Sequence, residues 1–429
     1  MGIVKLRGDK IIDKKYTASD IFQPASFPEY TYVTRQVSER ETYEAKLRRA
    51  LQTKGMLSFV TGASKSGKTV LCHKVIERDN LIEVSGSHIN SVGDFWLQIA
   101  EALLLPIEVE VTSGENREFA INAEIGARSG IPFIADGNVK GGTSFKDTNI
   151  NATKEKQQRS IKQIIEYMIT ANKVLVIDDY HYIEKSVQLS IARILKNEIF
   201  YGLKVVIISL PHRSDDAVRL NPDLNGRVRF ITIEQWSKDE LLQIPQKGFA
   251  LLELNMKSEL MDLLVQESIT SPQLMQQICL NISFAFDNDD RDISDREFIC
   301  NVFKDITEDL QYDKIIEKLI LGPSHGREKR KQYILKDGSK HDIYYVVLKA
   351  LAEDPPSVAI NMDQIEVRIL SVLAVNEVLP RRVDISNTLD QIQKILDNCG
   401  YKFEYMEWRE QTLNVLDSLF LFYLRWKNK

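Results

Sequence analysis

The sequence predicts an α/β fold: a parallel sheet covered by helices, followed by an α-helical region and a C-terminal domain of helices and a hairpin. Short apolar segments alternate with helical patterns up to about residue 235, which is typical of a parallel sheet with helices on both faces. Helical periodicity alone fills residues 237–320. Residues 343–429 then give three helical patterns and two strand-like segments.

The composition is that of an ordinary soluble protein with more than one domain. The 429 residues include 43% hydrophobic side chains and carry a formal net charge of −5, which excludes a globally basic nucleic-acid binder. The four cysteines are scattered without a C-x-x-C pair, which argues against structural zinc and a disulfide framework. The sequence contains neither a membrane-spanning apolar run nor the apolar core of a signal peptide. We therefore expect a cytoplasmic protein with no membrane partner.

The predicted core covers residues 31–235 and follows a polar N-terminal extension over residues 1–30. Its strands are short and apolar, and helical patterns separate them. They are predicted at residues 57–61, 81–84, 174–177, 204–208 and 228–233.

A glycine-rich insertion interrupts this core at residues 106–153, which hold six of the chain's twenty glycines. The segment is too long for an ordinary connection inside a compact α/β domain. Two interpretations stay open: a mobile surface insertion, or a loop that contacts a partner, a substrate or a neighbouring subunit.

The first strand runs directly into the pattern G-x-x-x-x-G-K-T, the signature of a phosphate-binding P-loop. Glycines let the backbone turn so that its N–H groups point at phosphates, and the following helix adds the positive end of its dipole. We expect Lys68 to reach the β- and γ-phosphates and Thr69 to hold Mg²⁺. The sequence therefore predicts a nucleoside triphosphate site. Its binding residues are Gly62, Ala63, Ser64, Lys65, Ser66, Gly67, Lys68, Thr69 and Val70.

A pair of acids follows the buried strand at residues 174–177. An acid at the carboxyl end of such a strand lies beside the phosphate loop. Asp178 is predicted to hold Mg²⁺, directly or through water, as a Walker-B acid does. Asp179 is then placed to orient or deprotonate the attacking water.

The region after the core is predicted to consist of a helical lid over residues 236–320, a basic linker over 321–342 and a winged-helix domain over 343–429. Two S-x-x-E capping boxes, at Ser237 and Ser294, mark helix starts in the lid. Three helices followed by a hairpin is the element order of a winged helix.

The predicted third helix of the winged-helix domain is a poor DNA reader. Such a helix normally enters the major groove, where phosphate contacts dominate affinity. Residues 384–397 carry three aspartates and one lysine, although Arg381 and Arg382 precede them. Protein contact is therefore favoured over DNA binding for this domain.

Taken together, the P-loop, the acid pair, the helical lid and the winged helix resemble the AAA+ superfamily. Within it, the chain is most similar to the initiator-like ATPases and the related signal-transducing STAND ATPases of bacteria and archaea. The resemblance covers the chain from about Tyr32 onwards and implies ATP and Mg²⁺ as cofactors.

The resemblance also assigns roles to residues outside the P-loop and the acid pair. Arg35 lies in a segment similar to the one that packs near the adenine, and Ser209 stands where such ATPases keep a polar γ-phosphate sensor. Arg227 is similar to an arginine finger, which stabilises the transition state of a neighbouring subunit. Arg229 and Arg219 are the second choices for this finger.

In the lid and beyond, the match to the family is looser. Pro272 corresponds to the G-x-P segment through which a STAND lid contacts nucleotide, although Thr270 or Ser271 stands where glycine is usual. The acid pair is Asp-Asp where AAA+ motors usually have Asp-Glu, and the shorter base favours slow turnover. The aromatic segment at residues 419–426 is expected to pack on the winged helix, with partner docking as the alternative.

The resemblance implies a nucleotide-driven switch that forms a homo-oligomer and acts on a protein effector or partner subunit, a type found in prokaryotic antiviral defence. The alternative is an initiator- or transposition-type ATPase that oligomerises on duplex DNA. DNA binding is the less favoured of the two because of the acidic third helix. A nucleotide-binding scaffold without activity is disfavoured because Lys68, Thr69, Asp178 and Asp179 are all present.

Overall fold

The computed structural model separates the chain into two compact units. We call Thr34–Gln235 the sheet unit, and Met1–Val33 together with Trp236–Lys429 the helical unit. The structure describes residues 16–105, 107–111, 117–121, 161–210, 226–286, 292–323, 330–398 and 405–427. No described helix has the length and apolar character needed to cross a membrane.

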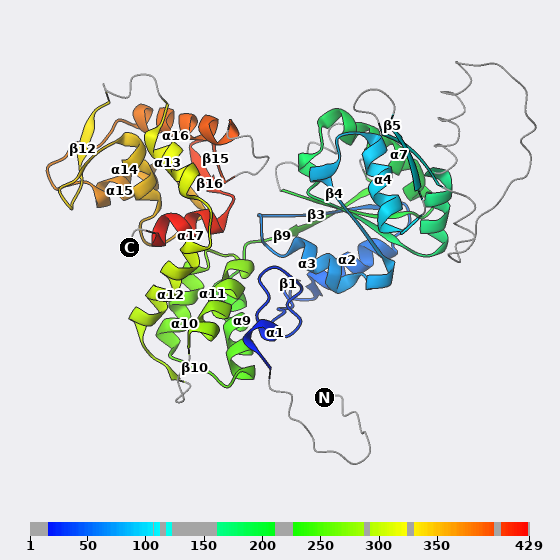
Figure 1. Ribbon diagram of the computed structural model, residues 1–429, viewed down its shortest axis with the longest axis horizontal. Coiled ribbons are helices and arrows are strands. Elements are labelled where there is room, and N and C mark those ends of the chain that lie inside the picture. The colour runs from blue at the N-terminus through cyan, green and yellow to red at the C-terminus, as the bar shows by residue number, and fades with distance from the viewer. Residues whose placement is uncertain are drawn as a thin grey trace, which may run out of the picture. The chain divides into compact units, whose positions relative to one another are not determined.

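The sheet unit is built on a parallel five-stranded sheet (Figure 1), as the sequence predicts. Val60 of the interior strand β3 pairs in register with Ile208 of β8 on one side and with Ile231 of β9 on the other. From edge to edge the strands are β4 (Leu81–Ser85), β7 (Val174–Asp178), β8 (Lys204–Ser209), β3 (Leu57–Gly62) and β9 (Val228–Ile233).

Helices cover both faces of this sheet because successive strand residues point to opposite sides. Phe59 packs in one core with α4, α7 and the helix over residues 161–170, whereas the next residue, Val60, packs in a second core with α2 and α3. Figure 1 shows α4 and α7 on one side of the strands and α2 and α3 on the other. The bounds of these helices are Tyr43–Gln52 for α2, Lys68–Val75 for α3, Val92–Ala102 for α4 and Lys185–Phe200 for α7.

Short elements complete the sheet unit. Part of the glycine-rich insertion forms an antiparallel hairpin of β5 (Ile107–Val111) and β6 (Arg117–Ile121), which the sequence analysis does not predict. The rest of residues 106–153 lies outside the described residues. The remaining short elements are β1 (Gln36–Ser38), β2 (Glu41–Thr42) and the 3₁₀ turns η1 (Arg78–Asn80), η2 (Gly86–His88) and η3 (Tyr180–Tyr182).

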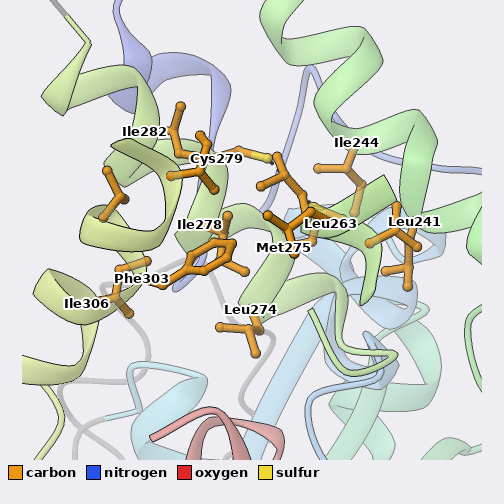
Figure 2. Packing of buried hydrophobic residues seen from close by; sticks show 14 of the residues in the cluster. Leu241, Ile244, Leu263, Leu274, Met275, Ile278, Cys279, Ile282, Phe303 and Ile306 are labelled. Atoms are coloured by element: carbon orange, nitrogen blue, oxygen red, sulfur yellow. Dashed lines mark hydrogen bonds between the residues drawn. The ribbon is translucent and has the colours of Figure 1, made fainter. Parts of the chain in front are cut away.

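The helical unit begins with a packed bundle whose apolar core is drawn in Figure 2. Side chains from four helices fill this core: α9 (Lys238–Leu251), α10 (Ser258–Glu267), α11 (Pro272–Ala285) and α12 (Arg296–Glu308). The capping box at Ser237 is confirmed. The one expected at Ser294 is wrong, because Asp295 is the N-cap of α12 and accepts from the N–H of Glu297.

The N-terminal residues take part in the same core, so a description of residues 1–30 as a polar extension needs correction. After the short helix α1 (Ala18–Ile21), Ile21 and Phe22 are fully buried in the bundle core. Apolar side chains are scattered through residues 1–30 without a helical or strand period, so the sequence pattern does not predict this packing. The bundle also contains the two-residue strands β10 (Asn255–Met256) and β11 (Asp292–Ile293), which pair in parallel.

Residues 343–427 follow the element order predicted for the C-terminal domain, with one additional strand, β14, in a sheet of order β14-β16-β15. The elements are α14 (Ile343–Leu351), β14 (Ala359–Asn361), α15 (Met362–Val372), α16 (Arg382–Asp397), β15 (Met406–Arg409), β16 (Thr412–Val415) and α17 (Ser418–Trp426).

The stretch at 321–342, predicted as a basic linker, is largely structured where it is described. Helix α13 (Asp313–Leu321) runs to its start, and β12 (Gln332–Ile334) pairs with β13 (Lys340–Asp342) in a hairpin. Tyr333 and Leu335 are buried in the core formed with α14 and α15. The high Lys and Arg content of the segment predicts an exposed linker, so the burial of these two side chains could not be predicted from composition.

Helix α17 joins the C-terminal domain to the bundle. Phe420 is buried in the core of residues 315–420, whereas Leu421, Phe422 and Trp426 are buried in the bundle core. The expectation that this segment packs on the C-terminal domain therefore accounts for only one side of the helix.

A buried ion pair fixes α17 to the bundle. The Arg425 guanidinium, with 0% of its side chain exposed, donates to both carboxylate oxygens of Glu267 at 2.7 and 3.1 Å. The indole N–H of Trp426 also donates to Glu267, at 2.7 Å.

Candidate nucleotide-binding site

The loop between β3 and α3 presents the amino end of a helix to an open turn. Gly67 adopts φ +93°, a left-handed conformation that glycine reaches without strain. It is the N-cap of α3, and no side chain among the described residues caps this helix end. The first N–H groups of α3 and the positive end of its dipole are therefore available to an anion.

Lys68, the first residue of α3, lies over the same loop. Its Nζ donates to the carbonyl oxygens of Gly62 at 3.1 Å and Ala63 at 2.6 Å. Burial lowers the pKa of Lys68 to about 8, against the opposing charges of Asp178 and Asp179. The ammonium is thus mostly charged at neutral pH and sits where a phosphate would meet the loop.

Thr69 and Asp178 form a polar pair from two different elements. The Thr69 hydroxyl donates to Oδ2 of Asp178 at 2.6 Å, and the N–H of Asp179 donates to Oδ1 at 2.7 Å. These contacts bring a hydroxyl and a carboxylate together beside the loop. Hydroxyl and carboxylate oxygens are the ligands that Mg²⁺ takes from a protein when phosphates and water supply its remaining ligands. The described residues contain no group of three or more His, Cys, Asp or Glu side chains that could hold a metal by themselves.

Asp179 follows β7 directly and has an unusual backbone. Its φ of 54° lies in the left-handed region that non-glycine residues rarely adopt. Burial raises the pKa of its carboxyl, the nearby Asp178 raises it further, and Lys68 lowers it. A carboxyl with a raised pKa beside a phosphate site is suited to accept a proton from water.

Ser209 ends the strand between β7 and β3 and is in register with Thr61 of β3. It is buried, and its hydroxyl has no hydrogen-bond partner among the described residues. A buried hydroxyl without a partner costs free energy of order 1–3 kcal/mol. An incoming polar group at this edge would relieve that cost, which fits the predicted sensor position.

Arg227 lies at the amino ends of the strands, whereas the P-loop lies at their carboxyl ends. It precedes β9, and its carbonyl accepts from the N–H of Leu57 at the start of β3 at 2.8 Å, whereas Gly62 at the end of β3 is paired with Ile233. At about 3.3 Å per residue, roughly 17 Å of strand separates these positions. Arg227 and Arg229 are exposed and do not contribute to the P-loop site of their own chain. Arg219 lies outside the described residues.

Arg35 supports the backbone at the loop edge of the sheet. Its Nη2 donates to the carbonyl oxygens of Glu234 and Gln235, both at 3.1 Å, directly after β9. The guanidinium also lies 5.3 Å from the centre of the Tyr43 ring. Pro272 belongs to the helical unit, where it is the first residue of α11 behind the N-cap Ser271.

Sequence reasoning missed the residue that holds the turn after the acid pair. The side-chain amide of Gln188 donates to the carbonyls of Tyr180 and Ile183 at 3.0 and 2.9 Å, and the Tyr180 hydroxyl donates back to the Gln188 carbonyl at 3.1 Å. In the sequence, Gln188 is one glutamine within a predicted helix, and such a residue does not by itself indicate this role.

Comparison with known protein families gives a match over part of the chain. Residues 50–215 match the profile of a family described as an AAA domain. No curated protein matches the chain.

Among solved structures, the chain is similar to Cdc6p from Pyrobaculum aerophilum, with 14% identity, a TM-score of 0.43, and coverage of 96% of this chain and 98% of the other. It is also similar to a Walker-type ATPase of Pyrococcus abyssi, with 12% identity, a TM-score of 0.46, and coverage of 89% and 94%. At these identities and scores, neither likeness bears on the site or on its function.

Proposed function

We propose that the AAA-type P-loop domain of this chain binds ATP with Mg²⁺ and hydrolyses it slowly. The observation that carries this proposal is the convergence of four side chains on one loop: Lys68, Thr69, Asp178 and Asp179. The second acid, Asp179, favours hydrolysis over binding alone, because its raised pKa suits it to accept a proton from water.

In this proposal each residue has one task. The N–H groups at the start of α3 and the Lys68 ammonium hold the triphosphate. Thr69 and Asp178 hold Mg²⁺, which would neutralise charge on the β- and γ-phosphates. Asp179 orients a water molecule and accepts its proton, and the Ser209 hydroxyl donates to the γ-phosphate.

The exposure of Arg227 supports a role for it in a second copy of the chain. Because it is remote from its own P-loop, it could complete only the site of a neighbour in a head-to-tail contact. We therefore keep Arg227 as the proposed finger in trans, and with it a homo-oligomer that assembles on ATP.

The proposed output is a conformational signal passed through a lid and a winged-helix domain. Residues 236–320 are the proposed lid, which contains the predicted nucleotide-binding residue Pro272, and residues 343–429 are the proposed winged-helix domain. A protein effector remains the favoured partner of this domain. An effector in prokaryotic antiviral defence rests on the family resemblance alone.

The charges on α15 and α16 favour a protein partner over DNA. Arg382 pairs with Glu366 and Asp363 at 2.6 and 2.5 Å, and Arg381 pairs with Asp384 at 2.9 Å. Both arginines that precede the acidic segment of the third helix are thus already matched by carboxylates. A DNA-loading ATPase stays the alternative proposal.

Two variants test the ATPase directly. Lys68→Ala should abolish binding of a fluorescent ATP analogue. Asp179→Asn should bind it within a few-fold of the wild type but lose roughly 10²–10⁴ in turnover, the usual contribution of a general base. Unchanged affinity in the first variant would overturn the site, and unchanged turnover in the second would overturn the role of Asp179.

Sizing of the wild-type protein separates the two proposed outputs. Light scattering is measured with ATP, with ADP, and with ATP plus duplex DNA. Assembly on ATP alone supports the switch, whereas assembly that requires DNA supports the loader and contradicts the switch.

A further inference from the structure

Gly86 lies opposite the acid pair, in the turn that follows β4. The last paired residues of β4 and β7 are Ser85 and Asp178. The next residue on each strand, Gly86 and Asp179, therefore face each other just beyond the sheet. Both begin or precede a 3₁₀ turn, η2 and η3 respectively.

The two backbones approach so closely that a side chain at position 86 would not fit. A Cβ built on Gly86 would lie 2.9 Å from the carbonyl carbon of Asp179, closer still to its carbonyl oxygen, and 3.1 Å from Cγ1 of Ile183. Real Cβ atoms essentially never come within 3.0 Å of other heavy atoms. The neighbour that would have to move is main chain and cannot rotate away as a flexible side chain could.

Side-chain hydrogen bonds hold both turns, η2 and η3, in place. The side chain of Gln98 in α4 accepts from the N–H of Ser85 at 3.0 Å and donates to its carbonyl at 3.4 Å, which ties η2 to that helix. On the other side, Gln188 in α7 binds the carbonyls of Tyr180 and Ile183. A side chain at position 86 would therefore push on a turn that is held at both ends.

The backbone of Asp179 is also the means by which Asp178 is oriented. The N–H of Asp179 donates to Oδ1 of Asp178, whose other oxygen accepts from Thr69. A displaced peptide at Asp179 would thus disturb the proposed base and the proposed Mg²⁺ ligand together. It would leave the glycine turn at Gly67 and the contacts of Lys68 with the loop carbonyls intact.

We infer that Gly86 is a positioning residue for the acid pair: its missing side chain allows Asp179 to hold its left-handed conformation beside the P-loop. This inference rests on the proposed ATPase function. It adds a residue that acts on the rate through the backbone of Asp179.

The test compares Gly86→Ala with His88→Ala, a control that changes an exposed side chain of the same turn and adds no atom against Asp179. Relief of the clash requires a shift of at least about 0.5 Å, and displacements of this order at a reacting group cost about tenfold or more in rate. We expect kcat of Gly86→Ala to fall about tenfold or more and the Mg²⁺ concentration for half-maximal activity to rise. The Kd for ATP measured without Mg²⁺ should stay within twofold, and His88→Ala should match the wild type in all three quantities.

The outcomes separate this inference from the proposed function. A wild-type protein that fails to bind or hydrolyse ATP overturns both. An active wild type with unchanged kcat and unchanged Mg²⁺ dependence in Gly86→Ala overturns only the inference. So does a lower unfolding temperature with unchanged kcat measured at 25 °C, because it shows that Gly86 matters for stability alone.

If Gly86→Ala does not fold, Gln98→Met tests the same idea from the other side. This variant keeps the volume of the side chain but deletes both hydrogen bonds to Ser85. We expect a several-fold loss of kcat with unchanged Mg²⁺-free affinity, and an unchanged kcat would contradict the inference.

Discussion

The affinity of this protein for ATP should fall as pH rises through about 8, because Lys68 then loses its charge. Burial lowers the pKa of this ammonium to about 8 in the nucleotide-free chain. A bound triphosphate would keep the ammonium protonated, since its negative charge favours the charged form. Affinity should therefore be nearly constant well below pH 8 and decline above it.

The size of the effect follows from the fraction of protein that carries the charge. With a pKa of about 8, roughly nine-tenths of the molecules have a charged Lys68 at pH 7 and about one-tenth at pH 9. Affinity should thus weaken about tenfold over these two pH units, which corresponds to about 1.4 kcal/mol.

Titration of a fluorescent ATP analogue at intervals between pH 7 and pH 9.5 measures this change. Lys68→Arg provides the comparison, because a guanidinium stays charged throughout the range and the ionisation of the nucleotide itself is the same. Lys65→Gln, which removes a different lysine of the loop, should retain the wild-type slope. A wild-type affinity that changes less than twofold, or that follows the Lys68→Arg curve, would refute the reasoning.

Two further predictions concern assembly and stability. If Arg227 acts in trans, Arg227→Ala and Asp179→Asn should each be inactive alone, and an equimolar mixture should recover part of the ATP hydrolysis; a mixture no more active than its components contradicts a shared site. Arg425→Met should lower the free energy of unfolding by about 3–5 kcal/mol, because it removes the cationic partner of the buried Glu267 carboxylate and leaves it the N–H of Trp426. A urea titration should show a smaller loss for the double variant Arg425→Met/Glu267→Gln, and equal or larger loss in the double variant would argue against the pair.

The features that sequence alone predicted share a local origin. The P-loop is a contiguous pattern in which strand, glycines and helix are adjacent in the chain. The placement of Asp178 beside the P-loop needs one further inference, which is that the carboxyl ends of parallel strands meet at one edge of the sheet. The hydrogen bond between Thr69 and Asp178 confirms this placement. The same rule places Ser209, at the end of the neighbouring strand β8, on this edge, whereas its sensor role is implied by the family resemblance alone.

The features that escaped prediction depend on close approach between distant parts of the chain. The role of Gly86 exists only because η2 and η3 are opposed in space, and a single glycine after a strand has many ordinary explanations. Tyr333 and Leu335 anchor a hairpin in a stretch whose composition reads as a linker.

The buried core shared by both ends of the described chain has a consequence for how the protein is made. Ile21 and Phe22 belong to the same apolar core as Leu421 and Trp426. Ribosomes add about 5–20 residues per second, so the last of these side chains emerges tens of seconds after the first. The sheet unit, by contrast, is one continuous stretch from Thr34 to Gln235. The whole sheet unit is therefore synthesised before α17, so the proposed ATP site is complete in the chain before the part that it is proposed to control.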